Sequence, residues 1–564
     1  MDRMAKNKAG GYISNITFNN DESIEIAPND IVIFVGPNNA GKSQALKDIF
    51  SLSAVKCPSI VISDINIIKY PGNVVDLLDE ISTPNYKNGH KHYQIMGSTI
   101  TVYDNLDSIF NSPGFDFLKN LFVAYLDTTA RLISCLPPQS ITRNAPKQHP
   151  IHYAAFNPDY RKWLGENFKQ AFGTEIIPNI LFGERIPLCI GEPFKFTTEY
   201  DDEQTRMEAY ADVLQGYKQV QDQGDGIKSF TGILLYLMLD YYCTYLIDEP
   251  ESFLHPPQAR IMGQIIGKTL SDQQQAFIST HSEDIIKGLL ETCPQRLKII
   301  RITRDGDTNH FSVLNNEKFS EVWNDPLLKH SNIMSSLFHK TVVLCESDSD
   351  CQMYSAIESH IKQKQGKYSE ALFIHCGGKQ RMARVITALR ALNVDVKLIP
   401  DIDVLNDEEV VKGIVNAYGI EWETIKPDYK KLVSNLHSPK EKINRSTVKE
   451  AIQQVLDGKT DQALSSEEIK QIQETIKTIS KWDSIKKMGV SAIPAGDATT
   501  AFRRLNTVLK AAGIFLVPVG ELECFIKEVG GHGPTWVNNV FENYSDFDNA
   551  VYNGITAFVS ELGL

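Results

Sequence analysis

The chain has 564 residues, of which 42% are apolar and 23% are charged, and its formal net charge is −13. This length predicts two to four domains with the composition of a globular protein. The acidic balance argues against a surface coated with basic side chains, but it is compatible with a local nucleic-acid groove or with metal-binding carboxylates. The N-terminus lacks an apolar signal, no apolar run approaches the roughly 20 residues of a membrane span, and the nine cysteines are scattered. These features predict a cytoplasmic protein with reduced thiols.

The first predicted elements surround a phosphate-binding loop. Residues 12–28 alternate apolar and polar side chains, which predicts a hairpin. A buried strand, IVIFV (31–35), then leads to GPNNAGKS (36–43), which has the G-x-x-x-x-G-K-S pattern of a loop whose backbone N–H groups cradle phosphates. The following helix directs its positive end at the anion. The residues expected to bind ATP here are Asn38, Asn39, Gly41, Lys42 and Ser43, with Ser43 also holding Mg²⁺.

Residues 51–220 have a mixed pattern, with short strands and a helix expected near 105–120. Within this region FVAYLDTTARL (122–132) is typical of a strand that leads to a polar turn and Arg131. An arginine at this place either faces a phosphate or is an ordinary surface residue, and the sequence leaves both readings open.

A second nucleotide-binding element lies at CTYLIDEP (243–250), a buried strand that ends in Asp248 and Glu249. Asp248 is expected to hold Mg²⁺ and Glu249 to polarise the water that attacks the γ-phosphate. Adjacent acids at the end of a buried strand are costly unless they serve a cation, and the alternative is an exposed acidic turn. A third apolar strand, QAFIS (275–279), leads to His281, which is placed to contact the γ-phosphate.

Between these elements, QGDGIKS (223–229) precedes a strongly apolar helix. With the phosphate loop and LIDEP, this set resembles the ABC-class ATPases, which include the SMC and RecF-like proteins, although QGDGIKS replaces the usual LSGGQ signature. The resemblance implies that ATP is sandwiched between the loop of one subunit and the signature of another. It therefore implies a homodimer or higher homo-oligomer in which Gly226, Lys228 and Ser229 also bind ATP.

The second half of the chain places acids after successive strands. Glu346 follows TVVLC, with Asp350 four residues on, and Asp401 and Asp403 follow VDVKLIP. Because the carboxyl ends of parallel strands meet at one edge of a sheet, these acids are expected to lie together. Two Mg²⁺ or Mn²⁺ ions roughly 4 Å apart, held by such carboxylates, support phosphodiester hydrolysis. The alternative is that each acid is a separate solvated turn residue.

This pattern, a strand-terminal Glu followed by a strand-terminal D-x-D, resembles the Toprim domain. A Toprim domain behind an ABC-class ATPase is the arrangement of the OLD (overcoming lysogenization defect) family, which includes the nuclease subunit of the Gabija anti-phage system. The resemblance assigns Glu346 and Asp350 to one metal site and Asp401 and Asp403 to the other. It adds Glu521 and Glu523 from AGIFLVPVGELECFIK (512–527).

The sequence departs from the family pattern in two places. Ser347 stands where a glycine often follows the first acid, and no lysine occurs after Lys527 to supply the expected catalytic cation. His532 is a candidate replacement for that cation.

The expected fold class is α/β. An ABC-class P-loop ATPase domain occupies residues 1–335 and has a large helical, dimerising insertion at about 80–215. A Toprim domain occupies residues 338–564 and has a helical insert at about 407–482. The functional segments of the first domain are the phosphate loop 36–43, the Walker B segment 244–249 and the switch 278–282. The insert carries Lys430, Lys431, Lys440, Lys442, Arg445 and Lys449, which form either a solvated helix face or a surface that grips duplex DNA.

The resemblance implies an ATP-regulated, metal-dependent DNA endonuclease of bacterial anti-phage defence. Its cofactors would be ATP with Mg²⁺ at the ATPase site and two Mg²⁺ or Mn²⁺ ions at the Toprim site. Its partners would be DNA and either a retron reverse transcriptase with its msDNA or a helicase, with no membrane. The alternative is a RecF- or SMC-like repair ATPase whose Toprim domain binds nucleic acid without cutting it. RNA as substrate stays open, whereas a strand-passage enzyme would need a tyrosine-bearing domain that the sequence does not suggest.

Overall fold

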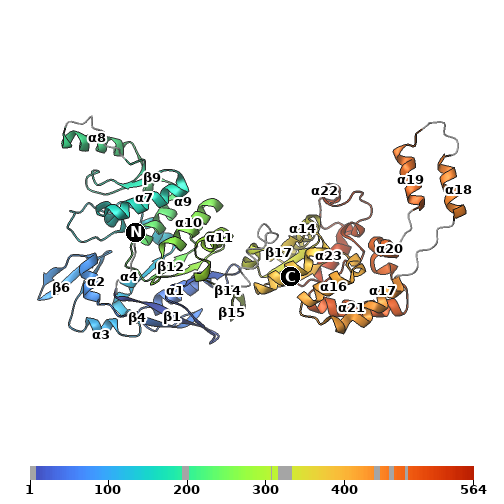
Figure 1. Ribbon diagram of the computed structural model, residues 1–564, viewed down its shortest axis with the longest axis horizontal. Coiled ribbons are helices and arrows are strands. Elements are labelled where there is room, and N and C mark those ends of the chain that lie inside the picture. Colours follow the sequence, from blue (N-terminus) through green and yellow to red (C-terminus); the bar gives the residue numbers. More distant parts are fainter. Residues whose placement is uncertain are drawn as a thin grey trace. The chain divides into compact units, whose positions relative to one another are not determined.

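The structure is a computed structural model that describes residues 8–193, 202–306, 308–314, 333–436, 445–456, 463–476 and 481–564. Backbone contacts divide the chain into two compact units, Met1–Glu321 (unit 1) and Val322–Leu564 (unit 2). Figure 1 draws unit 1 from blue to yellow-green and unit 2 from yellow to red. This division falls before the expected boundary at 335–338. Both units contain a parallel sheet with helices, which confirms the α/β fold class.

The centre of unit 1 is a six-stranded sheet in the order β15-β14-β3-β13-β12-β8. Its strands are β3 Ile31–Val35, β8 Val123–Leu126, β12 Thr244–Asp248, β13 Gln275–Ser279, β14 Leu297–Asp305 and β15 Thr308–Val313. All pairs are parallel except β14 with β15. β3 and β13 are buried along their whole length, as their continuous apolar runs require. The sheet therefore brings the phosphate loop, the acids after β12 and the switch after β13 to one edge.

Helices connect these strands. They are α1 Lys42–Leu52, α5 Thr128–Ile133, α6 Pro150–Phe156, α7 Pro158–Phe172, α9 Asp225–Leu237, α10 Pro256–Thr269 and α11 Glu283–Thr292. α1 packs on β12 and β13, and α9 packs on α5 and α7. α9 begins within QGDGIKS (223–229), the segment that resembles the ABC signature. Because α9 packs on α5, the start of α9 has a fixed position relative to α5.

A separate antiparallel sheet, in the order β2-β1-β4, contains the predicted hairpin. Its strands are β1 Gly10–Phe18, β2 Ser23–Glu25 and β4 Ile62–Tyr70. The buried Gln275 side chain ties this sheet to the start of β13. Its Oε1 accepts the Ile13 N–H at 2.9 Å, and its Nε2 donates to the carbonyl oxygens of Ile13 at 2.9 Å and Ala27 at 2.7 Å.

The expectation of a helical insertion at 80–215 is wrong in part. This region contains an antiparallel sheet of β5 Asn85–Lys87, β6 His90–Ile95 and β7 Ser98–Thr101, and a second formed by β9 Glu175–Pro178 and β10 Leu188–Gly191 with β11 Lys218–Gln219. It also supplies β8 to the central sheet. The remaining helices are α2 Val74–Ile81, α3 Leu106–Phe110, α4 Lys119–Phe122 and α8 Glu203–Gln215. The helix expected near 105–120 is interrupted at Gly114, where a Cβ would lie 2.0 Å from the Ala54 carbonyl oxygen.

Unit 2 is built on a parallel sheet in the order β17-β16-β18, with β16 Thr341–Cys345, β17 Ala371–His375 and β18 Asp395–Ile399. The predicted strand within 512–527 is reduced to one parallel bridge between Ile514 and Leu398. Backbone bonds from Phe515 N to Leu398 O (2.8 Å) and from Val517 N to Pro400 O (3.1 Å) keep this segment alongside β18. The chain then forms a short 3₁₀ helix, η8 Leu522–Phe525, rather than a longer strand.

The helices of unit 2 are α14 Asp348–Lys364, α15 Met382–Ala391, α16 Glu408–Ala417, α17 Trp422–Leu436, α18 Arg445–Leu456, α19 Ser466–Ile476, α20 Lys481–Met488, α21 Asp497–Ala512, α22 Pro534–Asn543 and α23 Asn553–Ser560. The expected insert at 407–482 is helical where the structure describes it. However, α16 packs on α15 and α17 packs on α21, so these two helices belong to the packed domain. Among the described helices, none is long and apolar enough to cross a membrane.

Among the described basic residues of the insert, the two lysines of α17 are paired with acids. The Lys430 ammonium pairs with Glu408, and Lys431 Nζ lies 3.0 Å from Asp497 Oδ2. Arg445 and Lys449 belong to α18, whereas Lys440 and Lys442 lie outside the described residues. The two lysines of α17 therefore already have acidic partners.

Candidate active sites

The phosphate loop of unit 1 leaves β3 through a glycine that has no room for a side chain. Gly36 has φ 141°, and a Cβ there would lie 1.9 Å from the Ile302 carbonyl oxygen. Gly41, with φ 100°, opens α1. The Lys42 ammonium donates to the carbonyl oxygens of Gly36 at 3.0 Å and Pro37 at 2.7 Å, so it lies inside the loop. Asn38 and Asn39 are exposed at the tip of the loop, and Ser43 is half-buried in the first turn of α1.

Lys42 is the cation of this site. Burial lowers the pKa of Lys42 to about 8, although Glu249, Glu251 and Asp248 favour its charged form. The loop therefore holds a desolvated ammonium whose positive charge is stabilised by the acids at the end of β12 and in the following turn. Such a group is suited to bind a phosphate, because an anion favours the charged form of the ammonium and offsets the hydration that burial removes.

The acids after β12 lie in a turn held by serines. The Ser279 hydroxyl donates to Asp248 Oδ1, and the Ser252 hydroxyl donates to Glu249 Oε2 at 3.2 Å. Glu249 has φ 47°, a left-handed conformation that is uncommon for a residue with a side chain. Such conformations are over-represented at functional sites.

Glu251 is a component of this site that the sequence analysis missed. Its Oε1 accepts the His281 N–H at 2.6 Å, while its Oε2 is buried and has no hydrogen-bond partner among the residues that the structure describes. Burial raises the pKa of Glu251. Burial also lowers the pKa of His281 to about 4, with the Lys42 charge lowering it further, so His281 is neutral at pH 7. The sequence signal was the second glutamate of DEPE.

The residues compared with the ABC signature lie at the start of α9 and differ in exposure. Lys228 Nζ pairs with Asp225 Oδ1 at 2.7 Å, and a Cβ on Gly226 would lie 2.6 Å from the Phe253 carbonyl oxygen. Ser229 is fully buried, and its hydroxyl accepts a hydrogen bond from Arg131 Nε at 3.0 Å. The structure therefore contradicts the expectation that Ser229 reaches ATP on another subunit. Both readings of Arg131 are also wrong, because this side chain is buried and contacts protein atoms.

In unit 2 the predicted acids gather into two groups, which differ from the predicted pairs. Ligand oxygens of Glu346, Asp401 and Asp403 lie within 4.8 Å of one another. Ligand atoms of Glu521, Glu523 and His532 form a second group with the same spacing. The first group is created by β16 and β18, which lie side by side in the sheet, so Glu346 is grouped with Asp401 and Asp403 rather than with Asp350 alone.

Asp350 has a structural partner. Its Oδ2 accepts the Ser347 backbone N–H at 2.8 Å and the Ser347 hydroxyl at 3.0 Å, which forms a capping box at the start of α14. This bonding explains how Ser347 is accommodated where a glycine is usual. Burial raises the pKa of Asp350, the Ser347 bonds oppose that change, and the charge of Glu523 adds to it. Asp350 therefore lies within electrostatic range of the second group.

Crowding of like charges is strongest at Asp401. Burial raises the pKa of Asp401 to about 9, and the charges of Asp350, Glu346, Asp403 and Glu521 contribute in the same direction. Burial and the Asp403 charge also raise the pKa of Glu346, whose Oε2 is buried without a hydrogen-bond partner in the described part of the chain. A protein that keeps so many carboxylates together has a site that needs positive charge.

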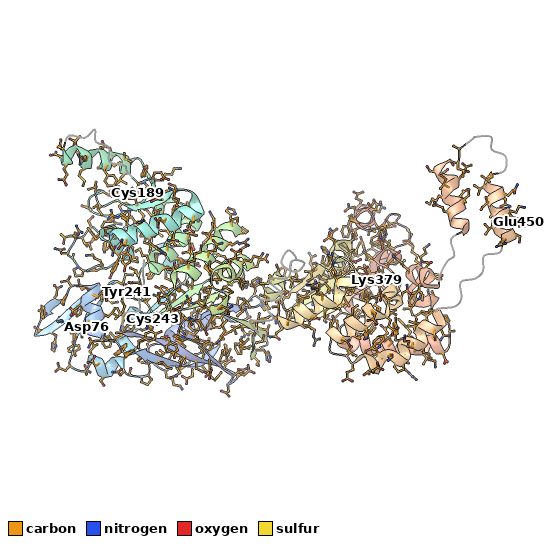
Figure 2. All side chains as sticks on the ribbon, viewed as in Figure 1. Asp76, Cys189, Tyr241, Cys243, Lys379 and Glu450 are labelled. Carbon is orange, nitrogen blue, oxygen red and sulfur yellow. The ribbon has the colours of Figure 1, made fainter. Side chains whose placement is uncertain are left out.

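Two lysines lie beside the acids. Lys379 follows the Gly377-Gly378 turn after β17, and its Nζ lies 3.5 Å from Asp403 Oδ2; Figure 2 labels Lys379. Lys486, in α20, lies with its Nζ 3.3 Å from Glu521 Oε2. Burial opposes the charged form of Lys486, but the attraction of Glu521, Asp403 and Asp401 raises its pKa. Neither lysine follows the last acid in the chain, so the sequence pattern did not reveal them.

The approach of Lys486 is fixed by two glycines. A Cβ on Gly520 (φ 117°) would lie 2.0 Å from the Lys486 carbonyl oxygen, and a Cβ on Gly489 (φ 60°) would lie 2.0 Å from the Pro518 carbonyl oxygen. The Ile402 N–H also donates to the Gly520 carbonyl at 3.2 Å. The end of α20 is therefore packed against the turn that carries Glu521. His532, by contrast, is exposed, with Nδ1 2.6 Å from Glu523 Oε1.

The donor set fits hard divalent cations. Carboxylate oxygens are the ligands that Mg²⁺ prefers, and the unpartnered Glu346 Oε2 and the raised pKa of Asp401 both favour an added positive charge. The residues that would hold metal are Glu346, Asp401 and Asp403 in the first group, and Glu521, Glu523 and His532 with the nearby Asp350 in the second. Bound divalent ions would supply charge stabilisation to a phosphodiester and lower the pKa of water.

Residues 337–403 match the family model described as "Overcoming lysogenization defect protein-like, TOPRIM domain". The matched segment runs from just before β16 to Asp403 and so contains the first group of acids. Unit 2 carries an OLD-like Toprim domain. The match ends before Glu521 and Glu523, which join the Toprim acids through the segment beside β18.

Two relatives are similar to parts of the chain. Old nuclease of Escherichia phage P2 is 22% identical over 167 residues, which is 28% of this chain and 28% of the length of that protein. The uncharacterized protein MJECL11 of Methanocaldococcus jannaschii is 33% identical over 88 residues, which is 15% of this chain and 77% of that protein. At this identity and coverage, the chain and the archaeal protein belong to one family over the shared segment.

Among solved structures, the Smc head domain of Pyrococcus furiosus, bound to the C-terminal domain of ScpA, is 12% identical. It covers 56% of this chain and 99% of its own, with a TM-score of 0.31. Unit 1 has the fold of a P-loop ATPase in its strand order and in the loops after β3, β12 and β13.

Proposed function

We propose that this protein is an ATP-regulated nuclease in which the Toprim domain of unit 2 cleaves a phosphodiester with divalent metal. The observation that carries the proposal is the convergence of Glu346, Asp401 and Asp403 from two neighbouring strands within 4.8 Å. Separate solvated turn residues would not share a site in which burial and neighbouring charges raise the pKa of Asp401 to about 9. The similarity to Old nuclease supports the same activity.

The protein's own residues divide the work of cleavage. Glu346, Asp401 and Asp403 would hold a divalent metal for phosphodiester cleavage, and Glu521, Glu523 and Asp350 would be further ligands. Lys486 carries the positive charge that the family pattern places after the last acid, because it lies beside Glu521 from a different helix. An ammonium there can contact a phosphate oxygen and stabilise the charge of the transition state.

Unit 1 supplies control by ATP. The Lys42 ammonium and the backbone N–H groups of residues 36–43 would bind the phosphates, Ser43 and Asp248 would hold Mg²⁺, and Glu249 would orient the attacking water. His281 is neutral at pH 7 and can donate or accept one hydrogen bond at the γ-phosphate. Gly224 and Asp225 are exposed at the start of α9, which suits contact with a nucleotide held by a second copy in a homodimer.

The OLD resemblance supports a proposal for the biological setting. We propose double-stranded DNA as substrate, a cytoplasmic location and a role in defence against phage. The altered signature favours the retron-associated group, whose partners are a reverse transcriptase and its msDNA, over the group encoded beside a helicase. Purification of the protein from its native operon, followed by identification of bound nucleic acid, tests this assignment.

The nuclease proposal is tested with supercoiled plasmid and Mg²⁺ or Mn²⁺. Wild-type protein should nick or linearise the plasmid, and Glu346→Ala and Asp401→Ala should not. Asp348→Ala is the matched control, because Asp348 is an exposed acid two residues after Glu346 and belongs to neither group. Cutting that survives in both metal-site variants would contradict the assignment, and DNA binding without any cutting would favour the repair ATPase instead.

A further inference from the structure

Arg131 lies in α5, directly after β8, and its side chain is 0% exposed. A guanidinium has five N–H donors, and all five are bonded. Nη1 donates to the carbonyl oxygens of Leu126 (3.0 Å) and Asp248, Nη2 donates to Thr128 Oγ1 (3.2 Å) and the Glu249 carbonyl oxygen (3.2 Å), and Nε donates to Ser229 Oγ (3.0 Å). One side chain therefore joins β8, the acid turn and α9.

These contacts are unusual for a buried charge. All five acceptors are carbonyl or hydroxyl oxygens, while the carboxylates of Asp248, Glu251, Asp127 and Glu249 act on Arg131 through space. Burial lowers the pKa of Arg131 against this attraction. An apolar side chain would fill the same space without the desolvation of a cation. The burial of a guanidinium here is therefore explained better by the fixed directions of its five hydrogen bonds than by the filling of space alone.

At one end, Arg131 fixes the acid turn. It bonds the carbonyl oxygens of both Asp248 and Glu249, and the Glu249 N–H donates to the Ser279 carbonyl at 2.9 Å. The backbone of Glu249 is thus held on both sides in its left-handed conformation. Since the carboxylate of Glu249 projects from this backbone, its direction depends on these bonds.

At the other end, Arg131 follows α9. Ser229 lies in the first turns of that helix, and a Cβ on Gly232 would lie 2.4 Å from the Arg131 carbonyl oxygen. The Cys135 thiol also lies 3.1 Å from the Lys228 carbonyl oxygen. Because α9 is held against α5 at Lys228, Ser229 and Gly232, a shift at the start of α9 must displace Arg131.

We propose that Arg131 is a positioning residue that links the start of α9 to the orientation of Glu249. Contact of residues 224–228 with a nucleotide held by a second copy would thereby change the placement of the hydrolytic acid. This inference rests on the proposed ATP sandwich. It assigns Ser229 to the transmission of that contact rather than to ATP itself.

The test compares two buried serines. Ser229→Ala removes the bond between α9 and the guanidinium, whereas Ser134→Ala removes a hydroxyl that donates to the Arg131 backbone carbonyl oxygen at 2.7 Å. We expect Ser229→Ala to lower kcat for ATP about tenfold with KM within twofold, and Ser134→Ala to stay within twofold of wild type. Arg131→Lys, which keeps the charge and loses the planar fork, should lower kcat about 100-fold. Equal losses in both serine variants, or a change confined to KM, would overturn the inference.

A second measurement does not depend on turnover. Hydrogen exchange of residues 244–253 should be faster in Ser229→Ala than in wild type and unchanged in Ser134→Ala. If wild-type protein hydrolyses no ATP but Ser229→Ala still exchanges faster than wild type, the proposed ATPase is refuted and the link through Arg131 is retained. If residues 244–253 exchange at the same rate in Ser229→Ala as in wild type, the link is refuted, whatever the ATPase activity.

Discussion

The nucleotide site of unit 1 and the acid site of unit 2 differ in how their charges are balanced. In unit 1 the Asp248 and Glu249 carboxylates accept hydrogen bonds from Ser279 and Ser252, and one ammonium, Lys42, lies inside a backbone loop. In unit 2 the carboxylates face one another, and lysines reach only the edges of the groups. The first site is organised by its own protein bonds, whereas the second is organised for an added cation.

The largest effect is expected at the acid site. Asp401→Asn and Glu346→Gln should lower DNA cleavage on the order of 10³-fold, because each removes a charge that metal requires. ATP hydrolysis should remain near the wild-type rate when it is measured on the same preparation. Parallel loss of both activities would show that the two sites are not separate in the way proposed.

The reciprocal change is Lys42→Ala. It should lower ATP binding and hydrolysis roughly 10²-fold, since the loop loses its one desolvated cation, and it should change regulation or assembly. The affinity of unit 2 for Mn²⁺, measured by calorimetry, should be unchanged. A Lys42 variant with normal ATP binding, hydrolysis and phage defence would mean that the phosphate loop carries less of the function than we assign to it.

A smaller effect is expected for the cation beside Glu521. Lys486→Ala should lower kcat for cleavage roughly 10- to 100-fold with little change in metal affinity, and Lys486→Arg should restore part of the rate. Lys487→Ala is the matched control, because Lys487 is exposed in the same helix. If His532→Ala is impaired instead and Lys486→Ala is normal, His532 is the cation.

The smallest effect concerns stability in chelator. The folded protein holds a proton on Asp401 up to about pH 9, whereas an unfolded aspartate releases it near pH 4. The folded state therefore binds more protons between these values, and Asp401 makes metal-free protein less stable as pH rises from about 4 to about 9. Asp401→Asn should raise the melting temperature at pH 8 by roughly 5 °C and change it little at pH 4.

The control for this measurement is Asp395→Asn, which alters an exposed acid at the opposite end of β18. It should leave the pH dependence of melting as it is in wild type. Added Mn²⁺ should stabilise wild type more at pH 8 than at pH 5, and it should stabilise Asp401→Asn weakly. Melting of wild type that is independent of pH in chelator would contradict the raised pKa of Asp401.

The sequence predicted the parts of both sites that follow buried strands. The runs at 31–35, 244–247 and 341–345 are strands, and their spacing placed Lys42, Asp248 and Glu346 at the edges of parallel sheets. A continuous apolar run shows where a buried strand ends, and the carboxyl ends of parallel strands lie at the same edge of the sheet. The α/β fold class was predictable for the same reason.

The sequence could not show the role of residues whose contacts come from outside these patterns. Arg131 depends on the packing of α9 against α5, and Lys486 depends on the approach of α20 to Gly520. Ser229 was misassigned because a signature pattern does not state which side chains of a helix turn inward. The grouping of Glu346 with Asp401 and Asp403 required the strand order of the sheet, which puts β16 beside β18.

The place of β3 in the sheet has a consequence for synthesis. β3 is made early, but it lies between β13 and β14, whose residues follow more than 240 positions later in the chain. At about 5–20 residues per second, the ribosome needs roughly 12–50 s to supply these neighbours. During that time the apolar run 31–35 has no strand partner in its own sheet, and the Gln275 amide that ties β1 to β13 does not yet exist. We therefore expect the nascent apolar run 31–35, next to the phosphate loop, to be a binding site for chaperones before the loop can bind a nucleotide.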